Sequence, residues 1–350
     1  MNKLHSLSFI LNFKRDKIQY NPTIDLLKSI AITMVIMYHC NSLLIQHNFF
    51  KTSLMCICSS CVPIFFILNG YLTLTPKKTN ICRHLYKTIH LLFIIIIWSI
   101  LLVSLTTLIK GETLSIRWIY NKILNNAIGY CNWIWFLNCL FILYLFKPIL
   151  QYILNSSNQF IYTWIIVGIF SIVLPTCDYL ISLISDQLNI TYLSRNLNPL
   201  YGWPSFSLFY FMGGVTLNKA KSIHLQSQIG LLILGILLAN LTTILTKKEH
   251  YDPVWNGYAT IYTALISFGI CNILLHKSIK TLPRIISTIG KNTLGIYLIE
   301  AILITYIKTV IKPTSSVSIY ICIVFIVLII STFLTIILRK VPFINKLFTL

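Results

Sequence analysis

Residues 24–40 read IDLLKSIAITMVIMYHC, an apolar stretch with the character of a membrane-spanning helix that nevertheless carries Asp25, Lys28 and His39. About 20 mostly apolar residues in a helix cross the hydrocarbon core of a bilayer, which is roughly 30 Å thick. Ionisable side chains at that depth are costly in lipid and normally face the protein interior or a water-filled cavity. The stretch therefore predicts a membrane helix whose polar residues have a specific task.

The three ionisable residues share one side of this predicted helix. Lys28 and His39 are eleven residues apart, so at about 100° per residue they differ by only about 20°. Asp25 is a helical neighbour of Lys28 and lies about 40° from His39. His39 also lies about 16 Å from Lys28 along the axis, past the middle of the core. A histidine at this depth either bonds a neighbouring helix or takes part in chemistry, and the shared stripe favours chemistry.

The rest of the chain predicts an all-α polytopic membrane protein. Of its 350 residues 56% are hydrophobic and only 10% are charged, with a mean hydropathy of +0.79, whereas soluble domains carry about 25% charged residues. About ten transmembrane helices are expected, of which the fifth could end early at Pro175. They span residues 24–45, 53–74, 88–109, 132–153, 160–184, 204–218, 229–246, 255–275, 286–307 and 317–338. We expect one domain over residues 1–350, no cleaved signal peptide, and a cytoplasmic N-terminal segment at 1–20.

The net charge of +20 is spread along the chain in a way that argues against nucleic acid as a partner. With both termini in the cytoplasm, 19 of the 28 lysines and arginines fall on the inner side and 9 on the outer side. The positive-inside rule therefore favours cytoplasmic termini and an even number of helices. The inner segment 75–87 holds four cations and a histidine. It suits either anionic lipid head groups or a phosphorylated cytosolic cofactor.

The ten cysteines do not predict a metal centre. The segment CICSSC, from Cys56 to Cys61, resembles a metal-binding cluster, but on a helix these positions do not share one face. No nearby histidine completes a tetrahedral set. We expect these cysteines to act as small packing residues, and we expect no metal.

A further ionisable residue, Glu300, lies inside the ninth expected span. If ionised, it needs a partner, and His39 is the obvious candidate. A carboxylate on one imidazole nitrogen orients the ring and makes the other nitrogen a better base. In the second span, Asn69 requires a hydrogen-bond partner, while Gly70 allows two backbones to approach closely.

Together these stretches resemble the type 3 acyltransferases, a family of bacterial inner-membrane enzymes, over residues 20–348. The family's Arg, ten residues, His signature reads here as Lys28, ten residues, His39. VPIFFILNGYL has Asn69 where the family usually has serine, and GIYLIE has Glu300 where histidine is usual. The segments WFLNCLFILYLFKP and YFMGG match further family elements in the same order.

The resemblance implies a single transmembrane acyltransferase domain in the bacterial inner membrane. It would transfer an acyl group, most often acetyl from cytosolic acetyl-CoA, to a sugar hydroxyl of a lipid-linked or surface polysaccharide. His39 would act as general base or as transient acyl carrier. Asp25 and Lys28 would position the helix and steer the donor, and Glu300 would orient His39. The remaining expected contacts are Arg83, His84 and Lys87 with CoA phosphates, and Asn69, Tyr71 and Trp135 with the substrate.

A transporter, flippase or polymerase of lipid-linked glycans is the rival interpretation. Such a protein needs no cytosolic thioester, and transporters typically show internal repeats and interrupted half-helices at matching places. Neither feature is clear in this sequence. Apart from acetyl-CoA and the glycan acceptor, membrane lipids are the expected partners.

Overall fold

The computed structural model describes residues 21–45, 49–74, 80–113, 115–117, 134–187, 205–219, 225–246, 257–277 and 279–349, and their regular structure is helical. No strand occurs in these ranges, where an isolated bridge joins Leu44 and Thr314. The all-α prediction is thus confirmed for the described chain, while the expected segment 1–20 lies outside it. The main helices are α2 (Pro22–His39), α3 (Phe49–Cys58), α4 (Cys61–Thr73), α5 (Ile81–Ile109), α7 (Trp135–Ile153), α8 (Ser157–Gly168), α9 (Leu174–Gln187), α10 (Phe206–Lys219), α11 (Leu225–Thr246), α12 (Ile261–Leu275), α13 (Arg284–Lys291), α14 (Thr293–Val310), α15 (Val317–Leu338) and α16 (Pro342–Asn345).

Within the described chain, seven helical segments are long and apolar enough to cross a membrane. They are Phe50–Thr73, Ile81–Ile109, Trp135–Ile153, Ser157–Asp178, Leu225–Thr242, Thr293–Val310 and Val317–Leu338. Two shorter apolar helices accompany them, at Phe206–Leu217 and Ile261–Leu275. Helix α2, which carries Asp25, Lys28 and His39, is not among the seven. A multi-pass membrane protein is therefore established, whereas the count of ten and the cytoplasmic termini stay predictions.

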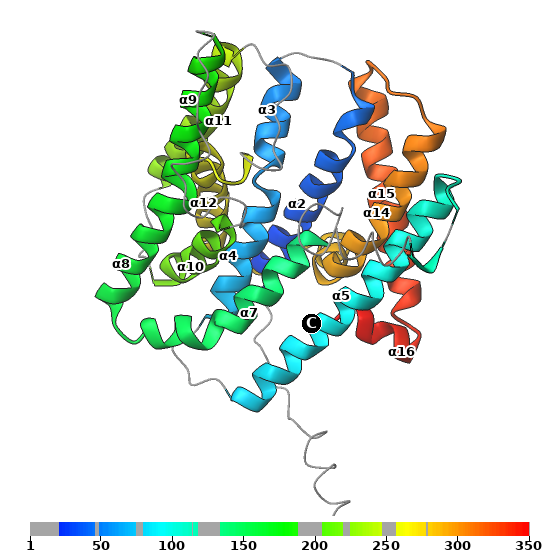
Figure 1. Cartoon of the computed structure of the whole chain (residues 1–350), viewed down its shortest axis with the longest axis horizontal. Helices are drawn as coiled ribbons and strands as arrows, with labels where there is room; N and C mark the ends of the chain where they lie inside the picture. The colour runs from blue at the N-terminus through cyan, green and yellow to red at the C-terminus, as the bar shows by residue number, and fades with distance from the viewer. Residues whose placement is uncertain are drawn as a thin grey trace, which may run out of the picture.

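Helix α2 runs through the middle of the bundle, in contact with α3, α4, α12, α13, α14 and α15 (Figure 1). Pro22 begins the helix, and the Asn21 side chain caps it by accepting from the Thr23 N–H at 3.0 Å. Leu27 and Ile36 are fully buried. Because α2 is enclosed by other helices, its polar side chains are sheltered from lipid.

Contacts at the two ends of α2 define two ends of the bundle. Near its start, the Ser29 hydroxyl donates to the Ile286 carbonyl of α13 at 2.7 Å. Beyond its last residue, Leu44 pairs with Thr314 in the connection between α14 and α15. We call these the α13 end and the Thr314 end. On the predicted topology they face the cytoplasm and the outside, respectively.

Several expected spans have different boundaries in the structure. The span expected at 53–74 is two helices, α3 and α4, separated at Ser59 and Ser60. The span expected at 160–184, with a possible early end at Pro175, continues to Gln187, because a π-helical turn at Ile169–Val173 precedes the proline. Such a turn rearranges the backbone hydrogen bonds that a proline disrupts.

Helix α5 begins seven residues earlier than expected, at Ile81 rather than 88. The Asn80 side chain caps it by accepting from the Arg83 N–H at 3.1 Å. Residues 81–87 are therefore the first two turns of a helix rather than a loop, while residues 75–79 lie outside the described chain. At 29 residues, α5 is roughly 43 Å long and crosses the bundle at a slant (Figure 1).

Helices α4 and α10 pack with their backbones in direct contact. A Cβ added at Gly70 would overlap the Phe211 carbonyl, and one at Gly214 would overlap the Ile67 carbonyl. Small residues allow such close approach between membrane helices. The close approach expected at Gly70 is thereby confirmed.

Candidate active site

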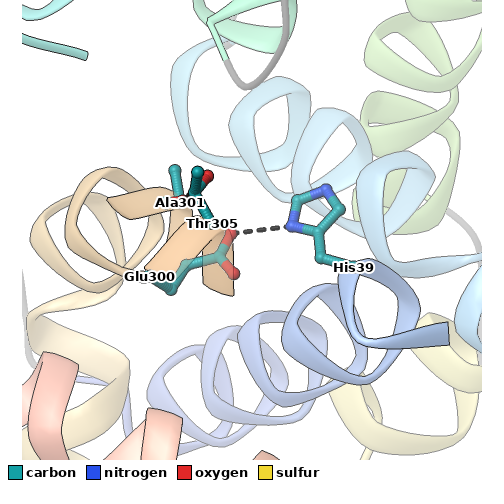
Figure 2. A network of polar contacts seen from close by, with 4 residues as sticks. All are labelled: His39, Glu300, Ala301 and Thr305. Atoms are coloured by element: carbon teal, nitrogen blue, oxygen red, sulfur yellow. Dashed lines mark hydrogen bonds and ion pairs between the residues drawn. The ribbon is translucent and has the colours of Figure 1, made fainter. Parts of the chain in front are cut away.

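His39 and Glu300 meet in the interior of the bundle. His39 is the last residue of α2, and Glu300 is the eighth residue of α14. The His39 Nδ1 and Glu300 Oε1 atoms are 2.8 Å apart (Figure 2). The His39 side chain is 21% exposed and the Glu300 side chain 0%. The helices thus bring together two ionisable residues separated by 261 positions in the sequence.

The contact assigns different roles to the two imidazole nitrogens. An ionised Glu300 only accepts hydrogen bonds, so Nδ1 carries the proton and Nε2 keeps a lone pair. Nε2 lies on the side of the ring opposite Glu300 (Figure 2). The nearby Thr305 hydroxyl donates instead to the Ala301 carbonyl, at 2.8 Å. The pair is therefore arranged to present Nε2 as a base or a nucleophile.

Two further polar atoms beside this pair are buried without a hydrogen-bond partner in the described part of the chain. They are the second carboxylate oxygen of Glu300, Oε2, and the hydroxyl of Tyr297, one helical turn earlier on α14. The Tyr297 side chain is 8% exposed. Buried polar groups usually have partners, so these two atoms call for an explanation.

Aromatic side chains line the region around the pair. The rings of Trp135 and Tyr258 are 5.5 Å apart, and Phe206 contacts both, at 6.2 and 5.6 Å. Phe136, the next residue on α7, contacts the Tyr297 ring at 6.0 Å. Trp135 thus belongs to an aromatic wall that reaches the neighbourhood of Glu300.

Asp25 and Lys28 lie at the α13 end of α2, away from His39. By helix rise they are about 21 and 16 Å from it along the axis. The Ser287 hydroxyl donates to Asp25 Oδ2 at 3.2 Å, and Gly290 packs against the Asp25 backbone. Asp25 therefore fastens α13 to α2. The three ionisable residues that share one side of α2 thus lie at two separate sites, Asp25 and Lys28 at the α13 end and His39 beside Glu300.

A second polar network joins α4, α5 and α7. His84 Nε2 lies 2.8 Å from the Tyr144 carbonyl oxygen, and the Tyr144 hydroxyl donates to Asn69 Oδ1 at 3.2 Å. Asn69 Nδ2 in turn donates to the Phe65 carbonyl at 2.8 Å. Asn69 has the partners that its place in an apolar helix requires. The network also shows that buried His84 and partly buried Asn69 link helices, and that neither is bonded to the His39 pair in the contacts of the described chain.

Cations gather beside this network. Lys87 of α5 and Lys147 of α7 both interact electrostatically with His84 and with each other. Arg83 lies one turn before Lys87 on α5. The sequence interpretation missed Lys147, although its position just before Pro148 near the inner end of a span was a usable signal. Tyr71, near the end of α4, is partly exposed. In the described chain it has no recorded contact with the cations or with the His39–Glu300 pair.

The cysteines of CICSSC are buried free thiols. Among the described residues, no group of three or more His, Cys, Asp or Glu side chains is arranged to hold a metal ion.

These features define a multi-pass membrane protein with a buried imidazole–carboxylate pair. The family model described as "Acyltransferase domain", that of the type 3 acyltransferases, matches residues 21–339. Since the match covers most of the chain, the protein belongs to this family. No curated protein and no solved structure matches the chain.

Proposed function

We propose that the protein transfers an acyl group, acetyl, from cytosolic acetyl-CoA to a sugar hydroxyl of a lipid-linked or surface polysaccharide in the bacterial inner membrane. The observation that carries this proposal is the 2.8 Å contact of His39 with fully buried Glu300 in a chain of the acyltransferase family. A reactive imidazole between the two ends of the bundle would join a cytosolic donor to an acceptor on the other side.

In the first version of the mechanism, His39 is a general base. Its Nε2 removes the proton from the acceptor hydroxyl while that oxygen attacks the thioester carbonyl, and Glu300 stabilises the imidazolium that forms. The proton then passes to the departing CoA thiolate. Donor and acceptor must be bound together for this route.

In the second version, His39 is a nucleophile. Its Nε2 takes the acyl group as an acyl-imidazole and releases CoA, and the sugar hydroxyl then receives the acyl group. Ping-pong kinetics would accompany this route, whereas the general-base route requires a ternary complex.

Donor binding is assigned to the cationic cluster of Arg83, Lys87 and Lys147. Guanidinium and ammonium groups suit the phosphates of CoA. His84 supports the cluster by bonding α7. Lys28 is proposed to steer the donor from the α13 end of α2, where Asp25 fixes the position of α13.

Acceptor binding is assigned to the aromatic wall that contains Trp135. Flat aromatic rings with a polar edge suit the apolar faces and hydroxyls of a sugar. Tyr71 is retained as a substrate contact by proposal, whereas Asn69 is assigned to the network that holds α4 and α7 together.

The test is mass spectrometry of the surface polysaccharide from cells that lack the gene and are then re-supplied with wild type or His39→Ala. We expect one acetyl mass per repeat unit with wild type and none with His39→Ala, at equal amounts of protein in the membrane. If the glycan is unacylated in all strains while its amount or chain length changes, export or polymerisation replaces acyl transfer. If His39→Ala restores full acetylation, both versions of the mechanism are wrong.

A further inference from the structure

The break between α3 and α4 places a helix N-terminus halfway through an apolar segment. The segment Phe50–Thr73 is long enough to span a membrane, and α4 begins at Cys61, near its middle. Helix N-termini carry partial positive charge and N–H groups without intrahelical partners. At this depth such groups need an acceptor, because no bulk water reaches them.

The first N–H groups of α4 have no strong acceptor in the described chain. Ser60 does not cap the helix, since its hydroxyl donates to the Ile57 carbonyl at 2.6 Å. Neither Cys61 nor Val62 donates its N–H to a described carbonyl outside the helix. The Cys61 sulfur lies at both N–H groups, but sulfur is a weak acceptor.

The Tyr297 hydroxyl is the independent sign of a missing ligand at this position. It is buried without a partner in the described residues. The Tyr297 ring contacts Phe136 at 6.0 Å, and Phe136 contacts Phe66 in the second turn of α4 at 4.9 Å. Two other buried tyrosines show what a structural hydroxyl does in this protein. Tyr210 donates to the Tyr258 carbonyl at 2.9 Å, and Tyr320 donates to the Met37 carbonyl at 2.6 Å. The Tyr297 hydroxyl, by contrast, has no such acceptor among the described residues, and it lies beside the His39–Glu300 pair.

We propose that the N-terminus of α4 and the Tyr297 hydroxyl together form the oxyanion site of this acyltransferase, an inference that rests on the proposed function. As the acceptor oxygen bonds to the acyl carbon, the π electrons of the carbonyl move onto its oxygen. That oxyanion receives hydrogen bonds from Tyr297 and from the N–H groups of Cys61 and Val62. When the intermediate collapses, the carbonyl re-forms and the CoA thiolate leaves, taking the proton that His39 removed.

The test compares Tyr297→Phe with Tyr210→Phe in the full-length protein. Both changes delete one buried hydroxyl and leave the ring. Transfer of labelled acetyl from acetyl-CoA to the host's own polysaccharide is measured in membrane vesicles, and thermal unfolding is measured on the purified protein. Tyr297→Phe should lower kcat about 10- to 100-fold, with the KM for acetyl-CoA within twofold and an unchanged Tm. Tyr210→Phe should do the reverse, lowering Tm while kcat stays within about threefold.

Two results would overturn the inference. One is a Tyr297→Phe enzyme with wild-type kcat. The other is a Tyr297→Phe protein whose loss of kcat is accompanied by a fall in Tm as large as that of Tyr210→Phe, since that pattern belongs to a structural hydroxyl. Absence of acetyl transfer by the wild-type protein would instead contradict the proposed function itself, so the two failures are distinguishable.

Discussion

Neither His39 nor Glu300 would be easy to accommodate alone at its position. A buried carboxylate without a partner is costly, and breaking a buried charge pair typically costs about 3–5 kcal/mol. At 2.8 Å the Nδ1 atom of His39 and the Oε1 atom of Glu300 satisfy each other, whereas Glu300 Oε2 has no partner among the described residues. The same contact that makes Glu300 tolerable in the bundle also holds the imidazole in one orientation, so the stability of the fold and the proposed reactivity of His39 depend on one hydrogen bond.

Replacing Glu300 by glutamine tests whether its charge serves the reaction. An amide can still accept from Nδ1, but it cannot stabilise an imidazolium. We expect Glu300→Gln to lower kcat about 100-fold, within the usual range for general acid–base catalysis. Acetyl transfer in membrane vesicles measures this effect.

Thr305→Val is the matched control for this substitution. Thr305 lies near the pair, but its hydroxyl is bonded to the Ala301 carbonyl of its own helix. Its kcat should stay within about twofold of wild type. Full activity in Glu300→Gln would show that the carboxylate only serves the fold.

At the scale of helices, the contact between α4 and α10 holds the broken second span in place. Gly70 and Gly214 each leave room for a carbonyl of the opposite helix. The same α4 carries the uncapped N-terminus at Cys61 and, two turns further on, Asn69 of the network with Tyr144. A shift of α4 would therefore disturb both ends of the proposed reaction path.

Gly70→Ala tests this packing. Its Cβ would overlap the Phe211 carbonyl, and backbone cannot move aside as a flexible side chain does. We expect a clear fall in Tm in detergent, with a loss of stability of about 1–3 kcal/mol or more.

Gly230→Ala provides the contrast on α11. A Cβ at this position meets nothing within 4 Å, and alanine is the better helix former by about 1 kcal/mol. Its Tm should be unchanged or higher. A Gly70→Ala protein as stable as Gly230→Ala would contradict the close packing of α4 on α10.

The sequence predicted the relations between residues better than it predicted the helix boundaries. His39 and Glu300 were an expected pair, because one is a base and the other an acid and both lie inside expected membrane spans. The break at Ser59 and Ser60 is marked only by the serine pair and by Pro63, which hydropathy does not register because the segment is apolar whether or not the helix is continuous. The bond by which His84 links α5 to α7 was not predicted either. Because the partner of His84 is a backbone carbonyl, which every residue has, no pattern of side chains predicts this bond.

At the scale of the whole molecule, the main prediction concerns orientation in the membrane, with the α13 end in the cytoplasm and the Thr314 end outside. Lys312 is exposed at the Thr314 end, and Lys340 is exposed just after α15. The 22-residue helix α15 separates these ends. We expect a membrane-impermeant maleimide to label Lys312→Cys in intact spheroplasts and Lys340→Cys only after permeabilisation. The background for this experiment replaces by serine the cysteines that are exposed in the described chain, Cys82, Cys177 and Cys322, and also Cys131, which lies outside the described residues.

Labelling of both cysteines after permeabilisation is the control for expression and folding. The reverse pattern would place the α13 end outside and move the cationic cluster away from cytosolic CoA. Equal labelling of both in intact spheroplasts would show that α15 does not cross the membrane.

The number of crossings depends on helices whose composition is ambiguous. α2 carries two charged residues, and α10 and α12 are only 14 and 15 residues long. Hydropathy recognises helices that face lipid, because lipid contact demands apolar side chains. α2 instead faces other helices along much of its length, so its role in the bundle followed from the pattern of its polar residues rather than from hydropathy.

The separation of His39 and Glu300 by 261 positions also has a consequence in time. At roughly 5–20 residues per second, a ribosome needs roughly 13–52 s to make the chain between them. During that interval the nascent protein holds an imidazole in the membrane without its carboxylate. The pair therefore forms near the end of synthesis, and a chain that stops after α12 would contain the histidine but not the acid that bonds it.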